Sequence, residues 1–156
     1  MQLKASTDYG LRAVLYLAHK ENLCSSRDIA REMSIPRDYL IQLAQLLRNA
    51  GIVEARPGKH GGYRLAKEPS EITLLDVMSA LDEDAKPVSR VRRGRRRETP
   101  MVERVKRAYA LVLDSYDAYL DSITLDMLLE CSTNEDGGEA YLANRLAAEG
   151  DRLAKA

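Results

Sequence analysis

The sequence predicts a mainly α-helical protein with one small β-hairpin. Three observations lead to this prediction: Leu, Ala, Arg and Glu are abundant, apolar residues recur at helical spacing, and a single pair of alternating runs flanks a glycine-rich turn. With 156 residues, 45% of them hydrophobic, the chain can bury one modest core with appended helices. We therefore expect one compact unit followed by a helical extension.

Two helices are expected at the beginning of the chain. The first spans Thr7–His19, where apolar residues recur on one helical face. The second is short and begins after Ser25, whose spacing to Asp28 is typical of a capping box. The turn Ser34–Pro36 ends it.

A third helix is expected at Pro36–Ala50. Proline is tolerated in a first helical turn because its missing N–H has no partner there, and Gly51 is placed as the C-terminal stop. The inward stripe of this helix consists of Leu40, Leu43, Ala44 and Leu47. Two helices joined by so short a turn form a helix-turn-helix, in which the later helix is the recognition helix.

The two alternating runs predict a β-hairpin at Val53–Leu65, with Gly58, Gly61 and Gly62 in its turn. A hairpin directly after a helix-turn-helix is typical of a winged helix-turn-helix domain. A fourth helix is expected from Thr73, which has a capping partner in Asp76.

A long helix is expected from Val102, because apolar residues recur at alternating spacings of three and four. Such a seam predicts a second helix packed along its length, and hence a dimer. The seam consists of Val102, Val105, Tyr109, Val112, Tyr116, Tyr119 and Ile123. A short helix ending at Cys131 and a last one around Tyr141–Leu153 complete the chain.

Three segments follow from this order: a winged helix-turn-helix domain at 1–83, an arginine-rich flexible loop at 84–100, and a dimerisation helix with C-terminal helices at 101–156. The formal net charge is zero, but residues 86–107 carry 10 basic against 2 acidic side chains, and residues 108–156 carry 3 against 10. Six arginines lie within Arg90–Arg97. This run fits phosphate binding, an anion or nucleotide sensor, or a solvated loop.

Several classes are excluded by composition. No apolar run is long enough for a membrane span and no signal-peptide layout begins the chain, so we expect a cytoplasmic protein that does not contact a membrane. Cys24 and Cys131 lie far apart without other ligand-type neighbours, so they are expected to be reduced structural thiols. No nucleophile or carboxylate accompanies His60 in the sequence as a catalytic partner, so we do not expect the protein to be an enzyme.

The expected function is binding of double-stranded DNA. A recognition helix fits the major groove, and a basic, glycine-rich hairpin can approach the adjacent backbone or minor groove. The candidate contacts are Arg37, Asp38, Ile41, Gln42, Gln45 and Arg48 on the helix and Arg56, Lys59, His60 and Arg64 on the hairpin. For the helix face alone, an ordinary solvated surface remains the alternative.

Four motifs in order, Tyr9–Ala13, Ser34–Leu40, Gly58–Tyr63 and Ile72–Val77, make residues 1–130 resemble the Rrf-two (Rrf2) family of regulators, of the IscR, NsrR and CymR type. The resemblance implies a homodimeric transcription regulator, usually a repressor, with a long crossed dimerisation helix. It also implies DNA contacts from Asp38, Ile41, Gln42 and the turn Arg56–His60.

The chain departs from the family pattern at two places. Pro57 stands where many members have arginine before the wing glycine, which leaves Arg56 as the minor-groove candidate. Iron–sulfur members carry three cysteines that residues 84–105 lack, so no cluster, metal or other cofactor is expected. Asp8 lies where some members supply a carboxylate ligand, but without those cysteines it is interpreted as a surface charge.

The working hypothesis is a homodimeric repressor on an inverted-repeat operator, released by a small-molecule or protein effector. Two alternatives stay open at this point. The scaffold can instead serve as an interaction module that binds and regulates a metabolic enzyme, and the seam tyrosines can instead line an effector pocket.

Overall fold

The computed structural model describes residues 3–82, 99–133, 141, 143, 144 and 147. Its elements, in order, are α1 Ala5–Lys20, α2 Ser26–Glu32, α3 Arg37–Asn49, β1 Val53–Arg56, β2 Gly62–Leu65, the 3₁₀ turn η1 Pro69–Glu71, α4 Leu74–Leu81, α5 Pro100–Asp121 and α6 Leu125–Thr133. The mainly α fold with one hairpin is confirmed. The arginine run and most of the helix expected at Tyr141–Leu153 lie outside the described residues.

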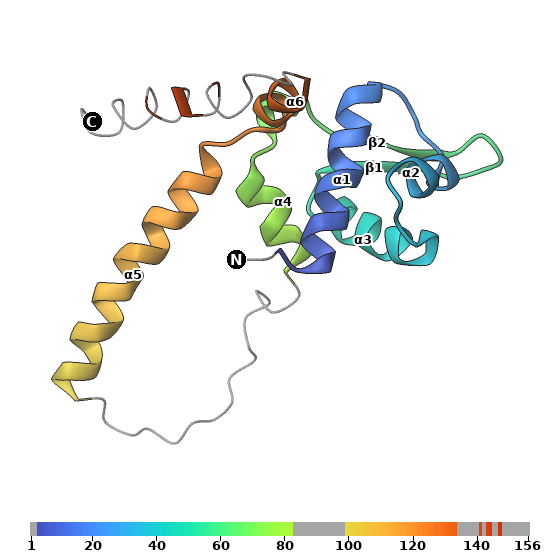
Figure 1. The fold of residues 1–156 in the computed structure, drawn as a ribbon. Coiled ribbons are helices and arrows are strands. Elements are labelled where there is room, and N and C mark those ends of the chain that lie inside the picture. Colours follow the sequence, from blue (N-terminus) through green and yellow to red (C-terminus); the bar gives the residue numbers. More distant parts are fainter. Residues whose placement is uncertain (1–2, 83–98, 134–140, 142, 145–146, 148–156) are drawn as a thin grey trace.

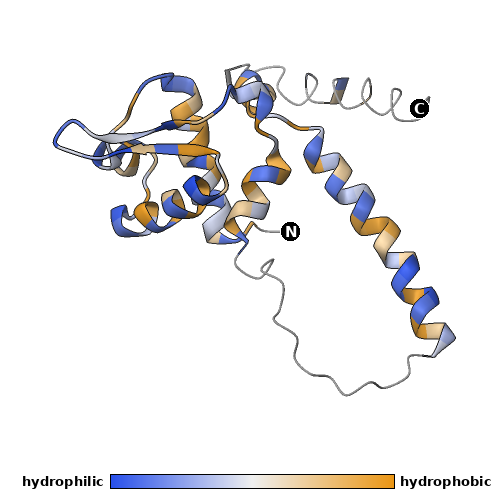
Figure 2. Cartoon of the chain, turned by 180° about the vertical axis from the view of Figure 1, so that it is seen from behind, coloured by the Kyte–Doolittle hydropathy of each residue, from blue (hydrophilic) through white to orange (hydrophobic). Residues whose placement is uncertain are grey.

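The core lies where α1, α3 and α4 meet, and it is closed by α2, the hairpin and the start of α6 (Figure 1). Val14 and Val77 are fully buried at its centre. Gly10 allows the close approach of α4, since a Cβ at this position would lie 2.2 Å from Leu81 Cδ1. Apolar stretches of α1 and α3 belong to this body, whereas the tip of the hairpin is hydrophilic (Figure 2).

The helix-turn-helix forms as the sequence predicts. The Ser25 hydroxyl caps α2 by accepting a hydrogen bond from the backbone N–H of Asp28 at 3.2 Å. Ser34 takes a left-handed conformation with φ of 54°, which turns the chain between α2 and α3 within four residues. All four residues of the predicted inward stripe of α3 are buried, and Gly51 leaves the helix with φ of 72°.

The wing is a two-stranded antiparallel hairpin in which Val53 pairs with Leu65 and Arg56 with Gly62. It is held to the body by backbone hydrogen bonds between Cys24 and Tyr63. A Cβ at Gly62 would lie 2.2 Å from the Cys24 carbonyl oxygen, so only glycine permits this contact. The wing therefore has a fixed position beside α2.

The long helix α5 leaves the body and stands apart from it (Figure 1). Every residue from 100 to 119 is exposed within one protomer. Only its C-terminal end packs on the body, through Leu120, and the chain then turns into α6.

Two boundaries in this region differ from the sequence prediction. The long helix, expected from Val102, begins at Pro100, and the Thr99 hydroxyl caps it by accepting a hydrogen bond from the Val102 N–H. Ile123, expected at the dimer seam, lies beyond the end of α5 and is 3% exposed within its own protomer. It belongs to the core because the seam ends where the chain turns back onto α4.

Candidate nucleic-acid interface

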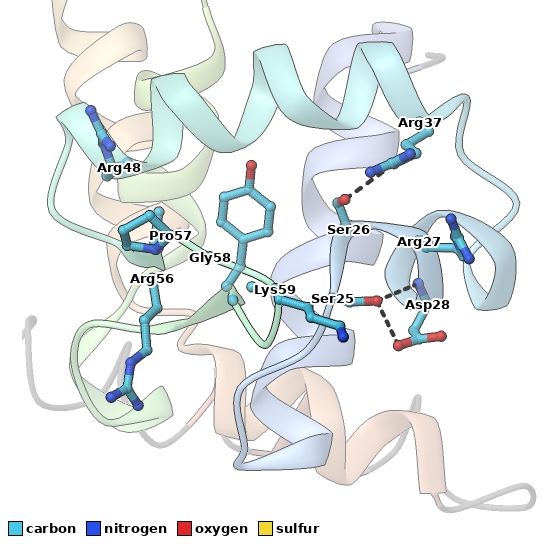
Figure 3. A pocket seen from close by; sticks show the side chains of 14 residues that line it. Ser25, Ser26, Arg27, Asp28, Arg37, Arg48, Arg56, Pro57, Gly58 and Lys59 are labelled. Carbon is cyan, nitrogen blue, oxygen red and sulfur yellow. Dashed lines mark hydrogen bonds between the residues drawn. The ribbon is translucent and has the colours of Figure 1, made fainter.

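An open groove of about 710 Å³ lies between α3, the beginning of α2 and the wing (Figure 3). Five basic side chains and one carboxylate line it: Arg27, Arg37, Arg48, Arg56, Lys59 and Asp28. The carboxylate is held by the Ser25 hydroxyl, which donates to it at 2.6 Å. In the part of the chain that the structure describes, no acidic side chain forms an ion pair with any of the five cations. The groove is therefore strongly electropositive.

Helix α3 forms one wall of the groove and carries an arginine at each end (Figure 3). Arg37 is oriented by a hydrogen bond that its Nε donates to Ser26 Oγ at 3.2 Å. Arg48 lies eleven residues further along, about 16 Å at the helical rise of 1.5 Å per residue. Two cations so far apart suit phosphates on the two sides of a major groove, which is about 12 Å wide, rather than neighbouring phosphates of one strand.

The outer face of α3 contains the remaining predicted contacts on this helix, and all of them are exposed. Ile41 is 41% exposed, an unusual position for an apolar side chain on a polar helix face. A hollow of about 460 Å³ runs from Ile41 and Gln42 to Ala55 and Tyr63 of the hairpin. Because Arg48 lines both the hollow and the groove, the two form one continuous surface.

The amides on this face differ in their surroundings. The Gln45 Nε2 donates to Asn49 Oδ1 at 2.8 Å, so this amide is already engaged within the helix. The Gln42 amide has no hydrogen-bond partner among the residues that the structure describes. Gln42 is therefore the amide that is available to an adenine edge.

The wing tip is exposed at Lys59 and His60. Gly58 adopts φ of 111°, a left-handed conformation that favours glycine, and it turns the chain back toward β2. Arg56 and Lys59 line the groove, whereas His60 does not.

Arg64, a predicted wing contact, lies on the face of the hairpin away from the groove. It pairs across the strands with Glu54, with Nη2 2.8 Å from Glu54 Oε2, and both side chains line a different hollow on the α1 side. Strand alternation explains this position, since Tyr63 next to it faces the groove. Arg64 is therefore separated from Arg56 and Lys59, the two wing cations that line the groove.

The sequence analysis missed Ser25, Ser26 and Arg27, which line the groove from the start of α2. The spacing of Ser25 and Asp28 predicts the start of α2, but only the fold places that helix end beside the wing. It also missed Tyr63, which was interpreted only as a strand residue and lines both the groove and the hollow.

The apolar residues of α5 form a second exposed surface. Six of the seven predicted seam residues are between 41% and 67% exposed within one protomer. Leu113 belongs to the same face, since it lies four residues after Tyr109 and three before Tyr116. Leu111, 69% exposed, lies on the opposite face of the helix.

The residues present do not fit an iron–sulfur cluster held by three cysteines. The chain has two cysteines, Cys24 before α2 and Cys131 in α6. Across the described ranges, no three His, Cys, Asp or Glu side chains gather into a metal-type cluster. Asp8 is engaged with the Arg12 guanidinium, at 2.6 Å between Oδ2 and Nη2.

Comparison with known proteins gives a consistent result. The family model Rrf2, described as an iron-dependent transcriptional regulator, matches residues 3–131. The chain is 32% identical to an HTH-type transcriptional regulator NsrR of Halalkalibacterium halodurans over 144 residues, covering 91% of this chain and 97% of the relative. It is also 32% identical to the HTH-type transcriptional regulator CymR of Bacillus subtilis, with 91% and 98% covered.

Solved structures agree with these relatives. IscR of T. potens superposes with a TM-score of 0.64 at 30% identity, covering 85% of this chain and 88% of that structure. CymR of B. subtilis, described as the global cysteine regulator, superposes with a TM-score of 0.63 at 32% identity, with 83% and 97% covered. These names favour DNA binding over the enzyme-binding module. Among the described helices, none has the length and apolar character needed to cross a membrane.

Proposed function

The chain belongs to the Rrf2 family and is a DNA-binding transcription regulator, and on that premise we propose that it acts as a homodimeric repressor at an inverted-repeat operator. The single observation that carries the proposal is the electropositive groove between α3 and the wing, with a row of exposed readout residues beside it. The domain that binds DNA is 1–83, and the part that pairs the protomers is 101–156.

In the proposed complex, α3 lies in the major groove. Gln42 donates to and accepts from an adenine, and Ile41 contacts a thymine methyl group. Asp38, exposed in the first turn of α3, accepts a hydrogen bond from a cytosine amino group. Gln45 plays the smaller part because Asn49 engages its amide.

The cations around the groove hold the phosphates that flank the recognition helix. Arg27 and Arg37 meet the backbone on the α2 side, while Arg48 and Lys59 meet it on the wing side. Arg56 is the candidate for the adjacent minor groove, where a narrow groove attracts arginine. His60, exposed at the tip, is the remaining wing contact.

Homodimerisation through α5 explains why its apolar face is exposed in one protomer. Two copies packed antiparallel, with the two-fold axis between Ala110 and Leu111, place a small residue opposite a large one in every layer. The layers are Val102 with Tyr119, Val105 with Tyr116, and Tyr109 with Val112. A parallel pair would instead place tyrosine on tyrosine and valine on valine.

Charge supports the same orientation. The first half of α5, residues 100–110, carries three basic and one acidic side chain, a net of +2. The second half, residues 111–121, carries three acidic side chains and no basic one, a net of −3. An antiparallel pair brings the basic half of one copy to the acidic half of the other, whereas a parallel pair opposes like charges.

We propose that this protein works without an iron–sulfur cluster of the three-cysteine type, because its two cysteines cannot supply that ligand set. Release from DNA then depends on a small-molecule or protein effector. The proposed place of action is the cytoplasm, where a bacterial regulator meets its operator, and no catalytic activity is assigned.

A gel-shift titration with the DNA upstream of the regulator's own gene tests the proposal. Arg56→Ala and Gln42→Ala are expected to weaken the dimer-sized complex by about tenfold each, since a bidentate base contact is worth about 1–3 kcal/mol. Arg64→Ala is the control and is expected to bind like the wild type. Unchanged sequence-selective binding in both test variants would contradict the contact assignment, and no complex even at low salt would contradict the function.

A further inference from the structure

The C-terminal end of α5 is locked to the beginning of α4 through one hydroxyl group. Thr73 Oγ1 accepts from the backbone N–H of Asp76 at 3.1 Å, which caps α4. The same hydroxyl donates to Asp121 Oδ1 at 3.1 Å, the last residue of α5. The Thr73 hydroxyl therefore accepts a hydrogen bond from α4 and donates one to α5.

The backbone adds two further links at this place. Segments 72–74 and 123–125 lie antiparallel, with Thr73 paired to Thr124. The Leu74 N–H donates to the Ile123 carbonyl at 2.7 Å, and the Leu125 N–H donates to the Ile72 carbonyl at 3.0 Å. Ile72, Ile123 and Leu125 are each at most 3% exposed, so a dry core supports the bridge.

Residues 100–119 of α5 are exposed, and Leu120 is the first residue of this helix that is buried against its own protomer. The direction of α5 relative to the DNA-binding body therefore depends on the joint formed by 72–74 and 121–125. Half of α5, about 11 residues, spans about 16 Å, so a rotation of about 10° at the joint moves its middle by about 3 Å. In a two-fold dimer the two displacements add to about 6 Å, nearly two base-pair steps of DNA.

We propose that this joint sets the spacing between the two operator half-sites, with Thr73 and Asp121 as positioning residues. The inference rests on the proposed homodimer on an inverted repeat. A rigid joint makes the two recognition helices address one half-site separation, whereas a loosened joint admits several. The contacts to each half-site do not change, because neither residue lies near the groove.

Two variants loosen the joint by different means. Asp121→Ala removes the acceptor of the Thr73 hydroxyl, and its charge-matched control is Asp117→Ala, one turn earlier on the exposed helix. Leu74→Pro removes the N–H that donates to Ile123 at the first position of α4, where proline is tolerated, and Thr73 before it is already extended at ψ of 160°. Leu74→Ala is its control, because it loses the side chain but keeps the N–H.

The experiment measures binding of the full-length protein to duplexes with the same two half-sites at separations varied by single base pairs, and to one isolated half-site. The wild type is expected to prefer one separation over a two-base-pair change by about tenfold. Asp121→Ala and Leu74→Pro are expected to lower that ratio by about threefold or more, with half-site affinity unchanged. Both controls keep the wild-type ratio.

A wild-type spacing ratio in both Asp121→Ala and Leu74→Pro would overturn the inference. If Leu74→Pro loses its half-site affinity through misfolding, the exposed Asp121→Ala variant decides alone. A wild type that binds no DNA refutes the proposed function first, and the spacing role with it. If the wild type binds half-sites but tolerates every separation, only the proposed role of the joint is refuted.

Discussion

Cys24 and Tyr63 exchange two backbone hydrogen bonds, at 2.9 Å from the Cys24 N–H and 2.8 Å from the Tyr63 N–H. This pair ties the second strand of the wing to the segment that begins α2. Two of the three sides of the electropositive groove, the wing and the start of α2, are therefore held at a fixed separation by the backbone itself.

Gly62→Ala is expected to separate the wing from α2, because the new Cβ would lie 2.2 Å from the Cys24 carbonyl oxygen. Loss of the two hydrogen bonds predicts a decrease of about 2 kcal/mol in the free energy of unfolding. Urea denaturation measures it, with Ser70→Ala at an exposed site of η1 as control. Equal stability of both variants would show that the wing is not anchored there.

Arg27→Ala is expected to weaken DNA binding nearly uniformly across sequences, because Arg27 lines the groove from α2 and serves a phosphate. The slope of log affinity against log salt is expected to fall in magnitude by about 0.9 for one lost phosphate contact. Arg64→Ala is the matched control, since Arg64 pairs with Glu54 on the other side of the wing. An equal change of slope in both variants would refute the assignment of the two faces.

Gln42→Ala is expected to relax sequence preference at one base pair of each half-site, at a cost of about 1–3 kcal/mol for the preferred base. Gln45→Ala is expected to change the preference less, because its amide already donates to Asn49. Competition binding against operators mutated at each position measures both. A larger effect for Gln45→Ala would reverse the proposed roles.

Val112→Glu is expected to convert the dimer to a monomer at micromolar protein, because it places two carboxylates near the two-fold axis of the seam. The adjacent Leu111→Glu lies on the opposite face of α5 and is expected to remain dimeric. Sedimentation equilibrium distinguishes the two. A monomeric Leu111→Glu with a dimeric Val112→Glu would place the interface on the other face.

The Cys24 thiol is expected to react slowly with iodoacetamide at neutral pH. Burial raises its pKa, the Asp28 carboxylate raises it further, and Lys20 only partly opposes this. The reactive thiolate therefore forms at higher pH than in a free cysteine, and the rate of alkylation should rise at a correspondingly higher pH. The measurement uses a Cys131→Ser variant, with free cysteine as reference, and an equal rate profile would contradict the shift.

Local signals in the sequence were sufficient for most of the DNA-binding body. The capping pairs at Ser25 and Thr73, the stripe on α3 and the glycines of the wing each depend on neighbouring residues, so periodicity and spacing predict them. The start of α5 is an exception. Thr99 and Pro100 are typical of a helix start, but they directly follow the basic segment and were assigned to the loop.

Tertiary relationships could not be predicted in the same way. The pairing of Arg64 with Glu54 depends on the register of the strands, which places Arg64 on the face away from the groove. The stretches Ile72–Asp76 and Ile123–Asp126 have similar sequences, but only the fold shows that Thr73 and Thr124 lie side by side. Ile123 joins the core for that reason.

Two copies of this chain are expected to read an inverted repeat through α3 and the wing. Sequencing of fragments that the purified protein enriches from a random DNA pool tests it most directly. The predicted result is one half-site motif in two inverted copies, with centres separated by about 10 base pairs or a multiple of that distance. Enrichment of single or directly repeated motifs, or no enrichment over the starting pool, would contradict it.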